Sequence, residues 1–306
     1  MNNPQAVRPT PNPLERFLKT PKGYVLAILV GLTLIAALRP QDHLGLLNAI
    51  VAVATGLVFD AGVALLQRRK KLFSDGAVIT ALIVADVLSH TTPLYIVAAT
   101  TAVALLSKHV LKVGRKPIFN PAAFGLLFAI VVFATGQSWW GSLALLPTWL
   151  ILLLLAGGLL ITERVNKFPQ VLAFLGTYFA LLLVMAIFHL GLPSDTPGDA
   201  LRIPFVNSAL YLAFFMLTDP PTTPAPYRQQ ILFGVIVAGV GTVIFAMSGG
   251  LAYLLVGLLV GNIWKTSLHW VTKTAERRGS SPLKKAVKGS ANAIRTEEGA
   301  SDQGLA

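Results

Sequence analysis

The sequence predicts an all-α, polytopic membrane protein, and its composition and hydropathy support this fold class. The 306 residues are 54% hydrophobic and only 12% charged, with a mean hydropathy of +0.68. Soluble domains carry about twice that share of charge. Long apolar runs recur between short polar breaks, and a run of about 20 residues can cross the roughly 30 Å bilayer core as a helix.

Ten apolar segments are expected along the chain. They lie near residues 23–38, 44–67, 75–88, 93–107, 118–135, 143–162, 168–190, 204–217, 231–247 and 249–265. If the N-terminus is cytosolic, 23 of the 25 Lys and Arg residues fall on the inner side, and only Arg39 and Arg202 fall outside. Cytoplasmic loops are enriched in Lys and Arg. We therefore predict a multi-pass protein of the plasma (inner) membrane with both termini in the cytoplasm.

Ten segments divide into two halves of five, and an odd number per half gives the halves opposite orientations. The sequence thus predicts a 5+5 inverted repeat. The third segment of each half is short, "DGAVITALIVADVL" and "PFVNSALYLAFFML". Short segments at matching positions are typical of discontinuous helices that meet near the midplane, although two segments can also be short by chance. The predicted parts are a cytosolic arm (1–22), two membrane repeats (23–135 and 136–265) and a basic, largely disordered cytosolic tail (266–306).

Charge and cysteine content narrow the function classes. The net charge of +12 is explained by membrane orientation and contact with anionic lipid, so nucleic acid is not an expected partner. The chain has no cysteine, which excludes disulfides, iron–sulfur ligation and thiol nucleophiles within it. We expect no haem ligand and no metal site. The sequence shows no phosphate-binding loop, dinucleotide fingerprint or zinc-protease motif.

The stretch "KPIFNPAAFG" (116–125) contains the first candidate site. Proline lacks an amide proton and fits the first turn of a helix, and an asparagine before it can cap the exposed amides. Asn120 and Pro121 therefore predict a helix start after a basic loop. The small residues that follow permit close approach of another helix or of a flat ligand. A plain capped helix and a ligand site at the helix end both remain open.

The stretch "FFMLTDPPTTPAPYRQQILFG" (214–234) contains the second candidate site. An apolar run ends at Thr218 and Asp219, and prolines then break it repeatedly. An acid at a membrane boundary is costly and indicates a function. Asp219 could cap a helix, bind a cation or accept a hydrogen bond from a ligand.

Together these motifs resemble the membrane subunits of respiratory flavin pumps. The family comprises the D subunit of the Rnf ferredoxin:NAD oxidoreductase and the B subunit of the sodium-translocating NADH:quinone oxidoreductase. Its Asn-Pro-Ala and Thr-Asp-Pro signatures match residues 120–122 and 218–220, and its Asp-Gly matches Asp75 and Gly76. The resemblance covers roughly residues 20–270. Each motif is short, but three in the same order on a ten-segment chain are fairly specific.

The resemblance implies an architecture similar to urea channels and a flavin, FMN or riboflavin, that passes electrons between partner subunits while Na⁺ or H⁺ moves. The implied partners are other membrane subunits and subunits that carry FMN or iron–sulfur clusters. We do not expect catalysis by this chain alone, because no nicotinamide or ferredoxin site is visible. The cofactor-binding candidates are Asp75, Gly76, Asn120, Pro121, Asn207, Thr218 and Asp219, and Asp86 is a candidate cation ligand.

One departure from the family concerns the outer loop after the fifth segment. Family members carry there a threonine, in an acidic context, that is linked to FMN through its phosphate. Here the loop is shortened to "ATGQSWWGSL" (134–143), and Thr135 lacks that context. We therefore expect a noncovalent flavin. Trp139 and Trp140 are interpreted as an aromatic belt at the membrane interface, with a stacking platform for a flavin as the alternative.

A small-solute channel or transporter on the same scaffold is the second functional hypothesis, because a fold does not fix a function. The shortened outer loop favours this alternative. The retained Asn-Pro-Ala and Thr-Asp-Pro signatures favour electron transfer, since a bare channel has no evident reason to keep them.

Overall fold

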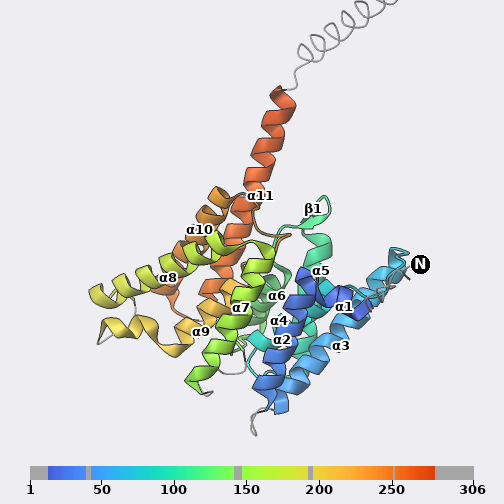
Figure 1. Ribbon diagram of the computed structural model, residues 1–306, viewed down its shortest axis with the longest axis horizontal. Helices are drawn as coiled ribbons and strands as arrows, with labels where there is room; N and C mark the ends of the chain where they lie inside the picture. Colours follow the sequence, from blue (N-terminus) through green and yellow to red (C-terminus); the bar gives the residue numbers. More distant parts are fainter. Residues whose placement is uncertain (1–12, 39–42, 141–146, 192–195, 251, 280–306) are drawn as a thin grey trace, which may run out of the picture. The chain divides into compact units, whose positions relative to one another are not determined.

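The computed structural model describes residues 13–38, 43–140, 147–191, 196–250 and 252–279, most of which are helical (Figure 1). The α-helices are α1 (Pro13–Leu18), α2 (Pro21–Ala37), α3 (His43–Leu66), α4 (Asp75–Val87), α5 (Leu94–Val110), α6 (Pro121–Phe133), α7 (Ile151–Val165), α8 (Phe168–Phe188), α9 (Ile203–Tyr211), α10 (Tyr227–Ser248) and α11 (Tyr253–Gly279). The other elements are the antiparallel strands β1 (Lys112–Val113) and β2 (Lys116–Pro117), the 3₁₀ turns η2 (Thr148–Leu150) and η3 (Pro197–Leu201), and the π-helical turn η4 (Leu212–Met216).

The chain divides into two compact units, Met1–Ile263 and Trp264–Ala306. The first unit contains α1 to α10 and the first turns of α11. The described part of the second unit, residues 264–279, is the rest of α11. The tail predicted as largely disordered covers residues 266–306. Its residues 266–279 are helical, and residues 280–306 lie outside the described residues. The predicted cytosolic arm likewise contains the short helix α1.

A helix is present at each of the ten predicted apolar segments. Among the described residues, four helices are long and apolar enough to cross a membrane: Leu44–Leu66, Thr148–Val165, Phe168–Phe188 and Tyr227–Ser248. Shorter apolar helices occupy Pro21–Ala37, Leu94–Val110, Pro121–Phe133 and Tyr253–Leu268. The all-α membrane class is thus confirmed, while the count of ten crossings and the inverted repeat stay predictions.

Two helices begin with a proline that directly follows a capping residue. At the start of α6, the Oδ1 atom of Asn120 accepts a hydrogen bond from the Ala123 N–H group at 3.1 Å, and Pro121 is the first helical residue. At the start of α2, Thr20 caps Gly23 in the same way, also at 3.1 Å, and Pro21 follows it. The predicted cap at Asn120 is therefore confirmed.

Small residues let neighbouring helices approach closely. An added Cβ atom at Gly125 of α6 would lie 2.8 Å from the Thr100 carbonyl oxygen of α5. At Gly234 of α10 it would lie 2.5 Å from the Gln170 carbonyl oxygen of α8, and α8 and α10 pack along each other (Figure 1). Such contacts are typical of helix packing in membranes, where small residues let backbones meet.

The helix α4 is too short to cross the bilayer alone, because 13 residues rise only about 20 Å. Beyond its end, the irregular segment 134–140 supplies hydrogen-bond donors. The N–H group of Trp140 donates to the Asp86 carbonyl at 2.6 Å, and that of Ser138 donates to the Val87 carbonyl at 2.8 Å. Carbonyls at a helix end that have no partner within the helix are thereby satisfied without water.

Trp139 and Trp140 are buried, so their interpretation as an aromatic belt at the interface is wrong. Trp140 has no exposed surface, and its Nε1 atom donates to the Leu32 carbonyl of α2 at 2.5 Å. Trp139 packs edge-to-face against Tyr211 of α9. Both tryptophans have left-handed backbone angles, φ 46° and 78°. A belt residue would keep one edge at the water boundary, whereas these two join α2, α4 and α9.

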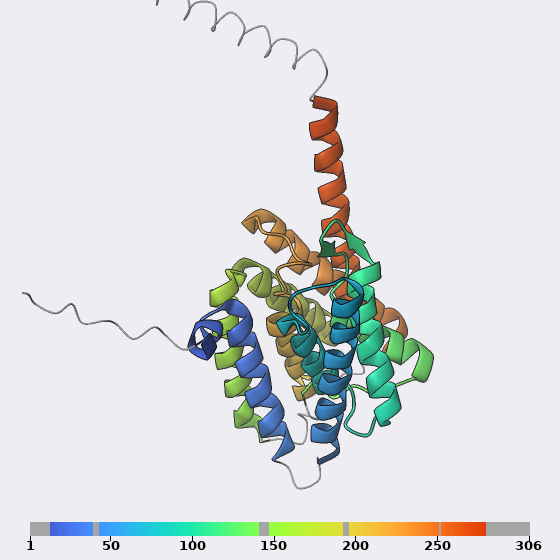
Figure 2. The same cartoon turned by 90° about the vertical axis from the view of Figure 1, so that its right-hand side faces the viewer.

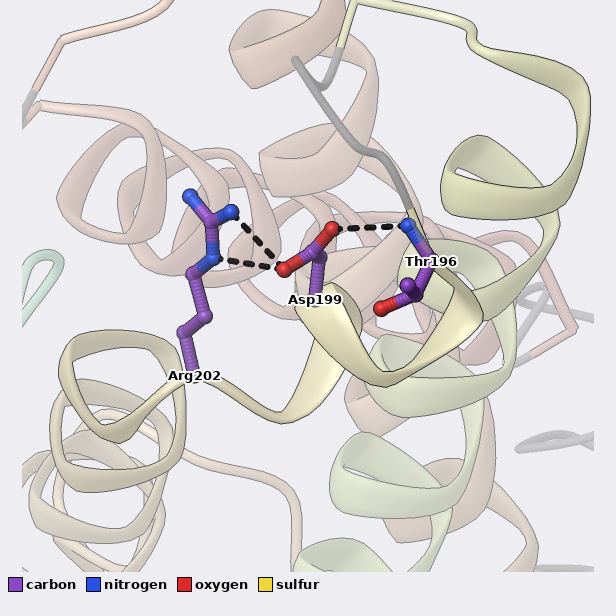
Figure 3. Close-up of polar contacts among 3 residues, drawn as sticks. All are labelled: Thr196, Asp199 and Arg202. Atoms are coloured by element: carbon purple, nitrogen blue, oxygen red, sulfur yellow. Dashed lines mark hydrogen bonds and ion pairs between the residues drawn. The ribbon is translucent and has the colours of Figure 1, made fainter.

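Before α9, the turn η3 leads into Arg202, one of the two basic residues predicted to face outward. Figure 3 shows Asp199 between Thr196 and Arg202. The carboxylate of Asp199 accepts from the Thr196 N–H group at 3.0 Å and from Arg202 Nε at 2.9 Å. The Arg202 charge is therefore neutralised locally at the start of the second short helix.

Candidate functional site

The described cavity brings together the three motifs that the sequence singled out. It has a volume of about 920 Å³, and its lining includes Asp75 and Gly76, Asn120 and Pro121, and Thr218 and Asp219. Figure 2 shows the β1–β2 hairpin in green and the chain before α10 in orange at the same end of the helices. This is the end that the sequence predicts to face the cytosol. The volume lies in the upper part of the range of about 300–1,000 Å³ that is usual for ligand pockets.

Asn120 connects three elements at the wall of the cavity. Its Oδ1 atom caps α6, and its Nδ2 atom donates to the Met216 carbonyl at the end of η4, at 3.1 Å. Its backbone N–H group donates to Oδ1 of Asn262 on α11 at 2.8 Å, and Asn262 donates in turn to the Thr222 carbonyl at 3.1 Å. Asn120 is buried and holds helix ends from both halves of the chain in place.

The residues of the "TDPPTT" stretch fold back on one another. The hydroxyl of Thr218 donates to the Phe214 carbonyl at 2.6 Å. The carboxylate of Asp219 accepts from the Thr222 hydroxyl at 2.8 Å, and its backbone carbonyl accepts from the Thr223 hydroxyl at 2.8 Å. Thr222 and Thr223 are buried, while Asp219 is half-buried at the cavity. The prolines and threonines thus fix the direction of the Asp219 side chain.

The Asp75-Gly76 pair begins α4. The N–H group of Ser74, just before the helix, donates to the buried carboxylate of Asp60, which also lies 3.8 Å from Arg69. An added Cβ atom at Gly76 would lie 3.0 Å from the ammonium nitrogen of Lys108. Glycine at this position therefore leaves room for the Lys108 side chain of α5 at the first turn of α4.

The rest of the cavity lining combines apolar side chains with the basic side chains of Lys22, Lys71, Lys108, Arg115 and Lys116. Phe17 of α1, Phe215 of η4, and Ile79 and Ile83 of α4 are among the apolar side chains. Prolines add flat apolar faces, and they are Pro21, Pro117, Pro121, Pro220 and Pro221. An apolar cavity with a few fixed polar groups is the usual form of a small-molecule site.

The remaining predicted residues lie outside this lining. Asn207 is buried on α9, and its Oδ1 atom has no hydrogen-bond partner in the described structure. Thr135 is buried just after α6, and its hydroxyl likewise lacks a partner among the described residues. Asp86 of α4 is buried, and its carboxylate accepts from Tyr211 at 2.9 Å and from Thr33 at 3.0 Å. Asp86 and the cavity are therefore separate features.

Several cavity residues are not predicted from the sequence. The sequence places Lys108 only in a basic loop and Phe215 only in an apolar run. Lys108 lies in the last turn of α5, where a lysine is ordinary, so the sequence carries no local signal for its place at the cavity. Within the described residues, no group of three or more His, Asp and Glu could hold a metal ion.

The fold and the cavity define a class: a helical, multi-pass membrane protein with an apolar, partly basic cavity at one end of its helices. Comparison with known families then identifies the particular group. The chain belongs to the NQR2, RnfD, RnfE family, whose model matches residues 17–145 and 138–276. The predicted family resemblance is thereby confirmed.

Individual relatives are similar at modest identity. The D subunit of the ion-translocating oxidoreductase complex of Pseudomonas paraeruginosa (strain DSM 24068 / PA7) is 28% identical over 265 residues, which cover 67% of this chain and 76% of that protein. The corresponding D subunit of Pseudomonas aeruginosa (strain LESB58) is 26% identical over 291 residues, covering 74% and 83%. That of Vibrio vulnificus (strain YJ016) is 35% identical over 98 residues, so the match spans 32% of this chain and only 26% of that relative.

Proposed function

We propose that this chain is a membrane subunit of an electron-transfer complex and that its cavity holds a noncovalent flavin. The observation that supports the proposal most is the meeting of three distant motifs, at residues 75–76, 120–121 and 218–219, on one cavity. These residues lie far apart in the sequence, so only the fold brings them together. The names of the relatives, each a D subunit of an ion-translocating oxidoreductase complex, support the same class of function.

A flavin, FMN or riboflavin, suits the chemistry of this cavity. Its isoalloxazine ring is flat and apolar on both faces, and the side chains of Phe17 and Phe215 and the proline rings offer matching surfaces. The ring has a polar edge that needs hydrogen-bond partners, and Asp219 and the amides at the first turns of α4 and α6 lie where they could provide them. The flavin would supply the redox chemistry, while this chain would position it and exclude water.

Electrons would enter and leave through partner subunits, because the sequence carries no dinucleotide-binding fingerprint and no cysteine that could ligate an iron–sulfur cluster. The proposed partners are other membrane subunits and subunits that carry FMN or iron–sulfur clusters. Asp86 is the proposed contact for a coupling ion, Na⁺ or H⁺, because a buried carboxylate within a membrane segment is costly and usually functional. Its two oxygens are held in fixed positions by Tyr211 and Thr33.

The flavin content of the purified protein tests the proposal. We expect a yellow protein with a flavin absorption spectrum, and we expect release of the flavin by denaturation without covalent attachment. Asp219→Ala and Asn120→Leu should lower the flavin content several-fold while the protein still inserts into the membrane. Asp219→Ala is the milder change, because Asn120 also caps α6.

Asn207→Leu is the matched control for Asn120→Leu. Both residues are buried asparagines, but Asn207 does not line the cavity and its Oδ1 atom has no partner in the described structure. Full flavin content in Asn207→Leu is therefore expected, and a loss equal to that of Asn120→Leu would move the flavin away from this cavity. A colourless protein that accelerates solute flux in liposomes would favour the channel function instead.

A further inference from the structure

Asn262 of α11 is fully buried, and both ends of its side-chain amide have partners. Its Oδ1 atom accepts a hydrogen bond from the Asn120 backbone N–H group at 2.8 Å, and its Nδ2 atom donates to the Thr222 carbonyl at 3.1 Å. A backbone N–H group can only donate and a carbonyl can only accept, so these two partners fix the orientation of the amide. Asn262 therefore connects the start of α6 with the chain between η4 and α10, although it does not itself line the cavity.

The connection continues from Thr222 to the cavity. Thr222 is buried, and its hydroxyl donates to the Asp219 carboxylate at 2.8 Å. Thr222 thus holds Asp219 through its side chain and is held by Asn262 through its backbone carbonyl. Because Asp219 lines the cavity, a displacement of Thr222 would move a polar group of the cavity wall.

Close packing of α11 against α10 sets the position of Asn262. An added Cβ atom at Gly257 would lie 2.5 Å from the Val237 carbonyl oxygen, and one at Gly261 would lie 2.6 Å from a methyl group of Val237. Distances this short leave no room for a side chain, so the two helices meet closely at both glycines. Gly261 directly precedes Asn262, and this contact therefore fixes where the asparagine points.

Helix packing alone does not require an asparagine at this position. The glycines of α11 and its buried leucines, such as Leu254 and Leu258, already supply the apolar contacts. Burial of an amide is costly unless it is hydrogen-bonded. The partners that meet this cost for Asn262 are backbone groups of Asn120, which lines the cavity, and of Thr222, which holds Asp219.

We propose that Asn262 is a positioning residue of the flavin cavity, which sets the place of Asp219 through Thr222 and does not touch the flavin. This inference rests on the proposed function. Because Asn262 also holds the backbone of Asn120, the polar groups of two distant motifs keep one position relative to each other. Partners that are already in place avoid the cost of ordering them when the ligand binds.

A double-mutant cycle on flavin affinity tests this role. Flavin-depleted full-length protein in nanodiscs is titrated with FMN and, in parallel, with riboflavin, and flavin fluorescence gives the Kd. The proteins compared are the unaltered chain, Asn262→Ala, Asp219→Ala and the double variant. We expect Asn262→Ala to weaken binding about tenfold, the factor that corresponds to about one hydrogen bond. In the Asp219→Ala background the same change should weaken binding less than about twofold, because the group that Asn262 positions is then missing.

Asn48→Ala is the matched control. Asn48 is buried on α3 and donates to the carbonyls of Ser89 and His90, beyond the end of α4, at 3.4 and 3.2 Å, but it does not line the cavity. Its removal should lower the unfolding midpoint about as much as Asn262→Ala and leave flavin affinity unchanged. Equal weakening of flavin binding by the two variants would show a general effect of stability and would overturn the positioning role. If Asn262→Ala does not fold, Asn262→Ser takes its place in the same cycle.

The remaining outcomes separate the inference from the proposed function. Failure of both flavins to bind to the unaltered protein would overturn the two together. Flavin binding that is unchanged in Asn262→Ala, or that is weakened equally with and without Asp219, would overturn the positioning role and keep the flavin cavity. Full affinity in Asp219→Ala would remove Asp219 from the site, and the positioning role would be wrong with it.

Discussion

At the scale of single residues, Asn120 shows how one side chain can build a site without being its chemical group. Its two polar atoms are used within the protein, one to cap α6 and one to hold the carbonyl of Met216. A ligand therefore competes with existing hydrogen bonds if it binds this side chain directly. The simpler role for Asn120 is to position the ends of α6 and η4, so that the groups around them face the cavity.

The candidate site is only partly predictable from its residues. Asn120 and Asp75 are polar residues directly before a proline or a glycine, which is unusual at the edge of an apolar run. Thr218 is indicated in the same way, because it directly precedes the Asp219-Pro220 pair. Lys108 has no such local signal, since a lysine at the end of an apolar helix is ordinary. Its role depends on Gly76, which is 32 positions away and contributes by lacking a side chain. A contact of that kind exists only in the folded chain.

Trp140→Phe tests the structural role of the buried tryptophan. The change removes the hydrogen bond from Nε1 to the Leu32 carbonyl and leaves space beside α2. We expect a loss of about 1–3 kcal/mol in the free energy of unfolding, measured by thermal or detergent-induced unfolding of the purified protein. Trp149→Phe is the control, because Trp149 is 64% exposed. Equal losses for the two variants would contradict a specific role of Trp140.

At the scale of elements, hydropathy predicts where helices lie better than it predicts how they end. The predicted segments 75–88 and 168–190 correspond to α4 and α8 within two residues. The segment 143–162 corresponds to α7 only from Ile151, because Pro147 and the turn η2 precede the helix, and residues 143–146 lie outside the described residues. The apolar composition therefore extends beyond the helix, into the turn that precedes it.

The segment 134–140 is the least predictable element. Tryptophan is typical of membrane interfaces, and the sequence therefore suggests an interfacial position for this segment. In the structure, its backbone N–H groups instead donate to the carbonyls at the end of α4. Interface and core tryptophans have the same hydropathy. They differ only in their partners, and Leu32, the partner of Trp140, is 108 positions away. The short length of α4 is visible in the sequence, whereas the segment that completes its end is not.

Gly158→Ala tests the packing of α7 against η4. An added Cβ atom at Gly158 would lie 2.1 Å from the ring of Phe214, so the π-helical turn would have to shift. Overpacking of this kind costs about 1–3 kcal/mol of unfolding free energy, and the shift would also disturb Phe215 and Thr218 at the cavity. We expect lower stability and lower flavin content in the same variant.

Gly176→Ala on α8 provides the comparison for this change. No atom lies within 4 Å of the added Cβ atom at Gly176. Alanine favours an exposed helix over glycine by about 1 kcal/mol. Unfolding measurements should therefore show an unchanged or higher midpoint for Gly176→Ala. Equal destabilisation of the two variants would indicate that helix composition, and not contact with Phe214, governs the effect.

At the scale of the whole molecule, the predicted orientation relates the positions of the cavity, α4 and α9 to the two sides of the membrane. If the inner side is the basic side, the cavity opens to the cytosol, α4 enters from that side, and α9 enters from the opposite side after the Asp199–Arg202 pair. Opposite entry of the two short helices is what an inverted repeat requires. The cavity lining draws on both predicted repeats, since Asn120 lies in the first and Thr218 in the second.

Cysteine labelling can test this orientation directly, because the natural chain contains no cysteine and needs no background removal. Lys70→Cys and Lys112→Cys place thiols in predicted inner loops, and Thr91→Cys and Gly198→Cys place them in predicted outer segments. All four positions are exposed in the structure, and none lines the cavity. In intact cells, a membrane-impermeant maleimide should label the outer pair only, and the inner pair should react after the cells are permeabilised. Labelling of Lys70→Cys and Thr91→Cys from the same side would mean that α4 and the segment after it do not connect the two faces. The alternation of ten segments, and with it the opposite entry of α4 and α9, would then be wrong.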